Sequence, residues 1–552
     1  MDRTHLEFMK ILNKYKLAII IFIGLLLRVL FVGSNPPGLT SDEAALGYNA
    51  YSILKTGRDE YGALFPIIFK SFGDYKPGLY VYLTVPSIAI FGLTEFATRL
   101  PSVLMGVAAI YLLYEIVKRV LENEKISFLS AFILSISPWH IQFSRGAWEA
   151  NAALTLTLFG VLFFLKSFKN NKYLIASSVS FALTLLAYQG AKMSSAIILL
   201  LLVAYYRKPF FKIEKKILII SFVVGLFISI PIILSLFNGM TGRLTVFSVF
   251  SYRRPEDYLY PFLNQGSEYI GSVKYYLFHS EVLNFTRGIL GRYFNHFSSD
   301  FLFFVGDWQN PRHTPPYHGV LLISDVILVV GSLFSLIKTK KSNVNFFLIW
   351  LLLAPLPSAL SRDQVSAIRA LQMLIPFSVI LAIGLDYLTR FKKIFVLFVP
   401  IYLMAFIYYL DALFIHVPNH DAELWHYEYK QMVQTVTPIQ NNYETVRVQQ
   451  SYAQPYIYFL FYQKYDPVKY QQQAKLIDSE VEQDVGKVEH LDNLYFGPID
   501  WSVNRGDTDT LFVADEVRMP IADSSDPEYF RLIKEIKYPN GFTAFRIVDV
   551  IK

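Results

Sequence analysis

Long apolar segments separated by short polar ones dominate the chain up to about residue 411. A bilayer core of about 30 Å is crossed by ~20 helical residues. Eleven runs are therefore predicted to cross the membrane, and they lie at about residues 17–33, 98–118, 126–138, 150–165, 173–188, 193–206, 217–237, 319–337, 345–361, 369–388 and 394–411. The pattern predicts an all-α polytopic membrane protein with about 11 transmembrane helices plus juxtamembrane helices.

One further apolar run, residues 77–92, does not fit this alternation. As a helix it would extend only ~24 Å at ~1.5 Å per residue, which is less than the thickness of the bilayer core. We expect a re-entrant or juxtamembrane helix on the outer side of the membrane. Residues 34–97 then form a first outer loop, and residues 238–318 form a second, longer one.

Basic residues indicate which ends of the helices face the cytoplasm. Lys10, Lys14 and Lys16 precede the first run, and the other basic clusters lie at residues 118–125, 166–172, 207–216, 338–341 and 390–393. Such clusters mark cytoplasmic loops, so the net charge of +7 does not indicate nucleic-acid binding. We expect the N-terminus in the cytoplasm, and we expect the first run to remain as a span instead of being cleaved as a signal peptide.

The tail after the last run contains no segment that is long enough to span a membrane. Its pattern predicts a helical piece at about 421–436, strand-like runs at Thr445–Gln449 and Thr510–Val513, and an aromatic-rich helix near 455–465. We therefore expect two domains, a transmembrane domain at residues 1–411 and a small α/β extracytoplasmic domain at residues 412–552.

Composition narrows the chemistry that is available. The chain has no cysteine, so disulfides, thiolate metal sites and thiol nucleophiles are excluded. Charged residues within predicted spans are few and lie near their ends, at Arg28, Glu115, Asp325 and Asp386. Because ion-coupled carriers place such groups inside the membrane, this distribution favours a site at the outer interface.

The polar stretch Gly38–Tyr48, in the first outer loop, contains the adjacent acids Asp42 and Glu43 at the predicted start of a helix. A purely structural interpretation is open, because Thr40 and Glu43 have the spacing of a capping box and acids in a first turn complement the helix dipole. The functional interpretation makes Asp42 and Glu43 catalytic residues, with Tyr48 as a further site candidate.

Other candidates lie in the remaining outer segments. Asp74 and Lys76 precede the short apolar run, where a cation could meet a lipid phosphate or simply anchor a helix end. Arg145 and Glu149 have i, i+4 spacing and could pair with each other. The remaining candidates are His296 in the long loop and Arg369 at the entry to a span.

In these residues the chain resembles the GT-C membrane glycosyltransferases of the protein O-mannosyltransferase and aminoarabinose-transferase superfamily, which use sugars linked to polyprenyl phosphate. The resemblance covers about residues 1–390. It rests on Asp42-Glu43, Lys76-Pro77, Arg99-Leu100-Pro101-Ser102, Ser137-Pro138-Trp139-His140 and the stretch from His296 to His313.

The resemblance implies roles for several of these residues. Asp42 would act as general base or orient the acceptor hydroxyl, and Lys76 would contact the lipid phosphate, with Arg369 as a second candidate for that contact. Some relatives bind a divalent metal through an acid just before this lysine and a histidine in the long loop. Here those residues would be Asp74 and His296, but Tyr75 displaces the acid by one position, which argues against an obligatory metal.

The resulting hypothesis is a glycosyltransferase that moves a sugar from a polyprenyl-phosphate donor to an extracytoplasmic acceptor at the outer membrane interface. The acceptor would be a protein, a lipid or a cell-wall glycan, and the partners would be the donor, membrane lipid and this acceptor, without nucleic acid. Two alternatives are a non-catalytic flippase or carrier of lipid-linked sugars, and a scaffold whose tail binds partners. The sequence leaves the sugar and the acceptor open.

Overall fold

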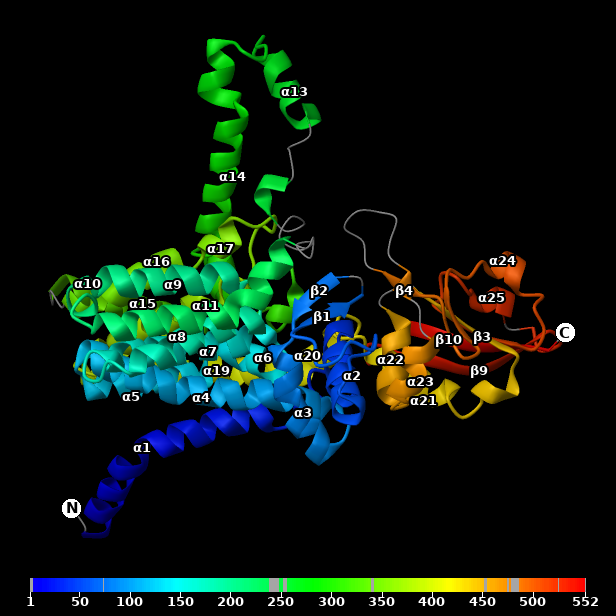
Figure 1. The fold of residues 1–552 in the computed structure, drawn as a ribbon, viewed down its shortest axis with the longest axis horizontal. Coiled ribbons are helices and arrows are strands. Elements are labelled where there is room, and N and C mark those ends of the chain that lie inside the picture. Colours follow the sequence, from blue (N-terminus) through cyan, green and yellow to red (C-terminus); the bar gives the residue numbers. More distant parts are fainter. Residues whose placement is uncertain are drawn as a thin grey trace.

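The computed structural model describes residues 3–551 apart from 73, 238–247, 252–255, 339–341, 451–453, 474–475, 478–485 and 525. Side chains of residues 1–14, 74, 236, 251, 256–258, 342 and 523 also lie outside the described part. A bundle of helices, which contains most of the chain up to residue 411, lies beside a smaller domain that contains the C-terminus (Figure 1).

All eleven runs predicted as spans contain helix. The corresponding helices are α1 (Arg3–Val29), α4 (Glu95–Leu121), α5 (Glu124–Ile136), α7 (Glu149–Ser167), α8 (Tyr173–Ala187), α9 (Ala191–Tyr205), α11 (Lys215–Phe237), α15 (Asp325–Lys338), α16 (Asn345–Leu353) with α17 (Leu356–Ala359), α18 (Leu374–Leu388) and α19 (Lys392–Asp411). Within the described residues, five helices are long and apolar enough to cross a membrane, or six if α5 and the bent α6 (Pro138–Arg145) form one span. Eleven crossings therefore remain a prediction.

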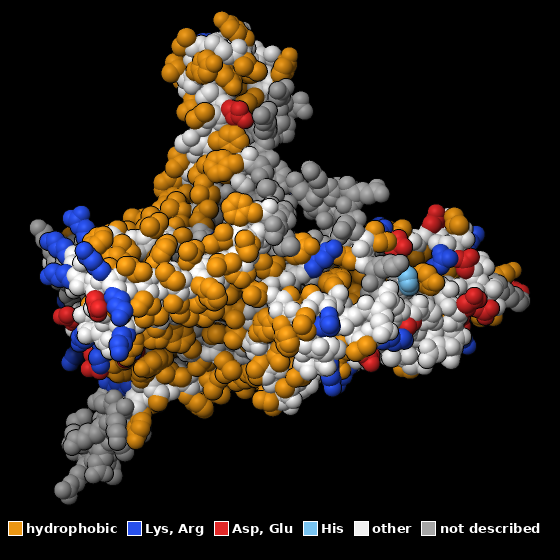
Figure 2. Space-filling model, in the orientation of Figure 1, with side chains coloured by type: hydrophobic (Ala, Val, Ile, Leu, Met, Phe, Trp, Pro, Cys, Tyr) orange, Lys and Arg blue, Asp and Glu red, His pale blue; other side chains and the backbone are white. Residues whose placement is uncertain are grey.

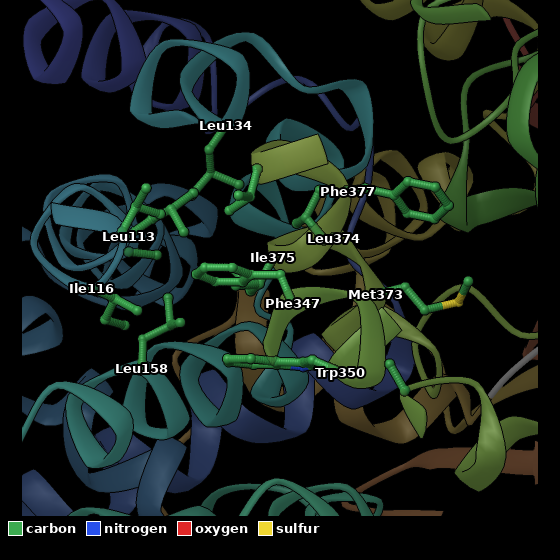
Figure 3. Packing of buried hydrophobic residues seen from close by; sticks show 14 of the residues in the cluster. Leu113, Ile116, Leu134, Leu158, Phe347, Trp350, Met373, Leu374, Ile375 and Phe377 are labelled. Atoms are coloured by element: carbon green, nitrogen blue, oxygen red, sulfur yellow. The ribbon is translucent and has the colours of Figure 1, made fainter. Parts of the chain in front are cut away.

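The core of the bundle is formed by aliphatic and aromatic side chains from α4, α5, α7, α16 and α18. Figure 3 shows Leu113, Leu134, Leu158, Trp350 and Ile375 in this cluster. Small residues permit close helix contacts, as is typical of membrane bundles. A Cβ added to Gly384 of α18 would lie 1.9 Å from the Leu328 carbonyl oxygen of α15, so this crossing requires glycine.

The first outer loop folds into α2 (Ser41–Thr56), a two-stranded antiparallel hairpin, and α3 (Leu79–Phe91). The hairpin strands are β1 (Ile68–Ser71) and β2 (Asp74–Pro77), with Phe69 opposite Lys76. The predicted short helix at 77–92 is thus present as α3, which packs against α2 and α4. Lys76 lies in β2, before the start of this helix, and the re-entrant position of α3 remains a prediction.

The second outer loop contains a helical arm that projects sideways from the bundle (Figure 1). It consists of α13 (Glu256–Gln265), a π-helical turn η2 (Tyr275–His279) and α14 (Glu281–Asn295). Short helical segments elsewhere in the bundle are α10 (Arg207–Phe210), η1 (Val249–Ser251), η3 (Asp300–Phe304), η4 (Pro311–His313), η5 (Ser342–Val344) and η6 (Leu371–Met373).

The tail forms the predicted α/β structure around a six-stranded sheet of order β6-β7-β3-β8-β10-β9. The strands are β3 (Thr445–Gln449), β6 (His490–Leu491), β7 (Leu494–Gly497), β8 (Thr510–Ala514), β9 (Phe530–Lys537) and β10 (Thr543–Val550). β3 is parallel to β7 and β8, and the other pairs are antiparallel. The strand predicted at Thr445–Gln449 is confirmed, and the run predicted at Thr510–Val513 extends by one residue.

Helices cover this sheet and connect it to the bundle. They are η7 (Ala412–His416), α20 (Val417–His420), α21 (Tyr427–Val436), η8 (Gln440–Asn442), α22 (Pro455–Tyr462), α23 (Pro467–Gln473), α24 (Trp501–Asn504) and α25 (Ile521–Ser524), beside a small pair of strands, β4 (Leu476–Ile477) and β5 (Lys487–Val488). The predicted helices near 421–436 and 455–465 correspond to α21 and α22.

A second apolar cluster joins the tail directly to the first outer loop. Tyr48 of α2, Tyr80 of α3, and Tyr456 and Phe461 of α22 are all buried in it. A Cβ added to Gly47 would lie 2.6 Å from the Phe461 ring, so α2 and α22 are in close contact. We propose residues 1–411 and 412–552 as two domains that pack together through this cluster.

Candidate active site

The candidate site is built on the first turn of α2. Thr40 is the N-cap residue: its Oγ1 accepts from the Glu43 backbone N–H at 3.2 Å, and its own N–H donates to Glu43 Oε2 at 3.1 Å. The predicted capping box is therefore present. This reciprocal pair holds the backbone of the first turn, from which the neighbouring Asp42 projects.

Glu43 is held from a second side by Arg99 of α4. The Arg99 Nε–H donates to Glu43 Oε1 at 2.9 Å, and its Nη2 donates to Oε2 at 3.0 Å. Both side chains are buried. Two parallel charge-assisted bonds make a pair that is strong and geometrically specific.

The two side chains of this ion pair also form hydrogen bonds to the surrounding backbone. Arg99 Nη1 donates to the carbonyl oxygens of Val32 and Pro36, each at 2.9 Å, and Nη2 donates to that of Gly38. Glu43 Oε1 also accepts from the Ala147 N–H at 2.8 Å. Both carboxylate oxygens of Glu43 thus have protein partners, as the structural interpretation expects, and its catalytic role stays a prediction.

Asp42 differs from its neighbour in being accessible. Its side chain is 53% exposed and forms an ion pair with Lys76 of β2, whose own side chain is only 9% exposed. The Lys76 ammonium also lies 5.8 Å from the centre of the Phe72 ring. An exposed carboxylate therefore stands beside a cation that the hairpin holds in a nearly buried position.

The turn between α8 and α9 also contacts the hairpin. Gln189 Nε2 donates to the Tyr75 carbonyl oxygen at 2.6 Å, and Lys192 Nζ donates to Gln189 Oε1 at 2.8 Å. Sequence reasoning did not select these two residues. The only available signal was their location in a short outer turn, which does not reveal that the turn reaches β2.

Arg369, the second predicted phosphate contact, forms an ion pair with Asp363 and donates to Ser361 Oγ at 3.0 Å. Both charged side chains are 17% exposed. This pair lies within the segment that connects α17 to η6. The role of Arg369 in phosphate binding stays a prediction.

His296 is held by backbone groups on both ring nitrogens. Nδ1 lies 2.7 Å from the Arg292 carbonyl oxygen, and Nε2 accepts from the Ser366 N–H at 3.2 Å. Burial lowers the pKa of His296 to about 4, so the ring is neutral at physiological pH. Both ring nitrogens of His296, either of which could bind a metal, are thus engaged in hydrogen bonds. The side chain of Asp74, the other predicted ligand, lies outside the described residues. Within the described part of the chain, no group of three His, Cys, Asp or Glu residues could hold a metal ion.

The other three predicted candidates are Arg145, Tyr48 and Glu149, and the contacts or helix position of each are as follows. Arg145 is buried and donates to the carbonyl oxygens of Leu27, Leu30 and Asn35 at 2.8 to 2.9 Å, so its guanidinium binds the backbone at the end of α1. Tyr48 donates to the Tyr465 carbonyl oxygen at 3.1 Å. Glu149 is the first residue of α7, where an acid complements the helix dipole.

The stretch from His296 to His313, on which the resemblance partly rests, contains a buried Asp–His pair that sequence reasoning did not recognise as a pair. Asp307 Oδ2 lies 2.6 Å from His313 Nδ1 and accepts from the Ala367 N–H at 2.7 Å. The His313 ring lies 5.2 Å from those of Phe143 and Trp148. Trp148 follows Ala147, which binds Glu43, so this pair packs against the segment that holds the first turn of α2.

Glu60 provides a pH-dependent prediction for the loop after α2. Its Oε1 accepts from Asn49 Nδ2 at 3.1 Å, and burial raises the pKa of its carboxyl from 4.5 to about 8. The folded state therefore binds a proton that the unfolded state releases, so stability falls as pH rises between these values. For one proton the slope is at most about 1.4 kcal/mol per pH unit.

We expect the thermal midpoint of Glu60→Gln to fall less than that of wild type between pH 5 and pH 8 (the range lies between the two pKa values). The measurement is thermal unfolding of the purified protein in detergent across this range. Glu444→Gln, at an exposed position, is the matched control and should retain the wild-type slope. Equal slopes for all three proteins would contradict the assignment.

Comparisons with known proteins place the fold. Residues 75–234 match the family described as dolichyl-phosphate-mannose-protein mannosyltransferase. No individually curated protein matches the chain. Among solved structures, ArnT from Cupriavidus metallidurans bound to undecaprenyl phosphate is similar with a TM-score of 0.55 and 11% identity, covering 97% of each chain.

A second similar structure is the Archaeoglobus fulgidus oligosaccharyltransferase tethered to an acceptor peptide. It has a TM-score of 0.48 and 13% identity, and it covers 97% of this chain and 74% of that one. The family match and the shared fold with ArnT confirm the predicted resemblance to the GT-C superfamily and a membrane location.

Proposed function

We propose that this protein is a glycosyltransferase that moves a sugar from a polyprenyl-phosphate donor to an acceptor at the membrane interface, with Asp42 as its catalytic base. The observation that carries the proposal is the Asp42–Lys76 pair: an exposed carboxylate paired with a nearly buried cation at the end of the bundle next to the C-terminal domain. ArnT, whose fold this chain shares, has been solved with undecaprenyl phosphate.

The chemistry requires two groups that this pair supplies. A carboxylate within reach of an acceptor hydroxyl can take its proton as the oxygen attacks the anomeric carbon. The carbon–oxygen bond to the phosphate breaks at the same time, and the phosphate leaves as an anion. A preorganised cation stabilises that developing charge. In this proposal Asp42 is the base and Lys76 contacts the phosphate, so donor binding would draw Lys76 away from Asp42.

Glu43 and Arg99 would position these two groups. The capping box and the buried ion pair hold the first turn of α2, so Asp42 does not need to be ordered by substrate. Catalytic groups held in advance lose less entropy in the transition state. We therefore assign Glu43 a positioning role and propose no metal-dependent step.

We further propose that the N-terminus faces the cytoplasm and that the Asp42 site and the C-terminal domain lie outside it. The basic residues Lys118 and Lys125 lie at one end of the α4–α5 pair, whereas Arg99 lies near the other end of α4, beside Glu43. By the positive-inside rule the end with Lys118 is cytoplasmic. The acceptor would then be extracytoplasmic, and its identity and that of the sugar stay open.

Replacing Lys76 with glutamine is expected to weaken donor binding. A hydrogen bond to a charged group contributes about 1.5–3 kcal/mol, which corresponds to a ~10- to ~150-fold loss in kcat/KM for the donor. Lys70→Gln, on the neighbouring strand, is the matched control and should stay close to wild type.

The measurement is transfer from a polyprenyl-phosphate sugar as its concentration is varied in vesicles that contain the purified protein. Lys76→Arg should recover part of the loss, because it keeps the charge. Wild-type kcat/KM for Lys76→Gln would remove Lys76 from the proposed site. If the wild-type protein moves the lipid-linked sugar across the bilayer but transfers none, the flippase alternative replaces the enzyme.

A further inference from the structure

The helical arm of residues 256–295 has no place in the proposed reaction, yet it exposes an unusual amount of apolar surface. At its tip and along the start of α14, seven large apolar or aromatic side chains are each more than 60% exposed: Tyr269, Ile270, Val273, Tyr276, Leu277, Phe278 and Val282. Soluble surfaces rarely expose apolar patches of more than a few hundred Å². The arm is therefore built for an apolar environment.

Helix α14 has two distinct faces. Val282, Ile289, Leu290 and Tyr293 fall on one side of the helical wheel, whereas Asn284, Arg287, Gly291 and Asn295 fall on the opposite side. Such a division, with cations on the polar side, is typical of helices that lie in a membrane interface with the apolar face turned into the lipid.

The arm begins at the end of the bundle that carries the candidate site. Asn295 Nδ2 donates to the Gln364 carbonyl oxygen at 3.1 Å, and the Tyr293 hydroxyl donates to the Leu352 carbonyl oxygen at 2.8 Å.

A chain of contacts leads from this region toward the candidate site. The Ala367 N–H donates to Asp307, Asp307 is the partner of His313, and His313 packs on Trp148. The basic residues Lys338 and Arg390 lie at the far ends of α15 and α18. The base of the arm is thus near the interface where Asp42 lies.

The direction of the arm fits a membrane surface. In Figure 1, α14 runs across the direction of α8, α9 and α11, so it extends along the membrane plane if these helices cross it. Figure 2 shows apolar side chains on the bundle and, next to them, along the arm. A lipid layer that covers the bundle would therefore also meet the arm.

We propose that the arm of residues 256–295 is a membrane-interface element, which inserts its apolar face into the lipid leaflet next to the candidate site and keeps Arg287 and Arg292 at the headgroups. Cations at this level attract anionic lipid. The arm thereby extends the protein sideways along the interface at which a lipid-linked donor would approach. This proposal concerns lipid contact and does not depend on the reaction assigned to Asp42.

The test uses the absence of cysteine in the native chain, since any introduced cysteine is a unique labelling site. Leu290→Cys and Gly291→Cys differ by one residue but lie on the apolar and polar faces; a Cβ added at Gly291 meets nothing within 4 Å. Val282→Cys provides a second apolar position. Each full-length variant is spin-labelled in nanodiscs of phosphatidylcholine and phosphatidylglycerol, and collisions with oxygen and with a water-soluble nickel complex are measured.

We expect the labels at 282 and 290 to lie ~5–10 Å into the lipid, with high oxygen and low nickel accessibility. The label at 291 should be accessible to nickel. Equal nickel accessibility at all three positions would place the arm in water and overturn the proposal. Protection of 282 and 290 from both reagents would overturn it as well, because a protein surface would then cover the face; spin–spin broadening would identify a second copy of the chain.

Discussion

Asp42→Asn is expected to reduce the rate of sugar transfer by about 10²- to 10⁴-fold, the usual contribution of a positioned general base. Asparagine keeps the size of the side chain and its ability to accept a hydrogen bond from Lys76, but it cannot take the acceptor proton. Because Asp42 is half exposed and the first turn of α2 is fixed by Glu43, the fold should not change.

The measurement for this prediction is kcat with saturating donor, together with thermal unfolding of the same preparation. Asp300→Asn is the matched control: it makes the same chemical change at an exposed acid of the second outer loop. Its rate should stay near that of wild type. If Asp42→Asn unfolded at a much lower temperature, the loss of rate would reflect stability, and Asp42 would return to a role in the helix dipole.

Arg99→Met is expected to cause the largest loss of stability. Removing one partner of a buried ion pair typically costs about 3–5 kcal/mol, because the other charge is left buried without compensation. Here that charge is Glu43, and three backbone carbonyls would lose their donor as well. We expect little folded protein after purification, measured as the monodisperse fraction in detergent and the midpoint of thermal unfolding.

The double variant Arg99→Met/Glu43→Gln separates the charge from the packing. With Glu43 neutral, the buried charge is gone, so the double variant should be more stable than Arg99→Met alone. Such non-additivity is the signature of two residues in direct contact. If the two losses simply added, the pair would contribute little and the positioning role of Glu43 would lose its basis.

The sequence predicted the helical segments well because apolar periodicity reports directly on burial and lipid contact. The runs at 217–237 and 394–411, for example, correspond to α11 and α19 within a few residues. Whether α3 crosses the membrane is less predictable. Its 13 residues are as apolar as those of α8 or α9, and length alone does not separate a short span from a re-entrant helix.

The site was only partly predictable, and the reason is long-range contact. The capping box follows from local spacing, so the sequence could propose it for Thr40 and Glu43. The partner of Glu43 is Arg99, 56 residues away, and no local pattern could pair them. The same holds for Gln189, which reaches the hairpin from a turn over a hundred residues later.

Arg145 and His296 show a second limit of sequence reasoning. Both are polar residues in outer segments, and sequence reasoning placed them among the site candidates. The structure surrounds them with backbone groups: carbonyl oxygens at the end of α1 for Arg145, and one carbonyl and one N–H for His296. A polar side chain beside irregular backbone is often needed to satisfy its hydrogen bonds, and sequence spacing does not reveal such backbone.

The central claim is that Asp42 and Lys76 carry out sugar transfer from a lipid phosphate. The most direct test is release of polyprenyl phosphate from a radiolabelled polyprenyl-phosphate sugar by the purified protein in vesicles, with the acceptor supplied as a membrane and cell-wall extract. The account predicts that wild type releases polyprenyl phosphate together with a labelled acceptor, and that Asp42→Asn releases neither while still binding the donor. Equal release by the two proteins would contradict it.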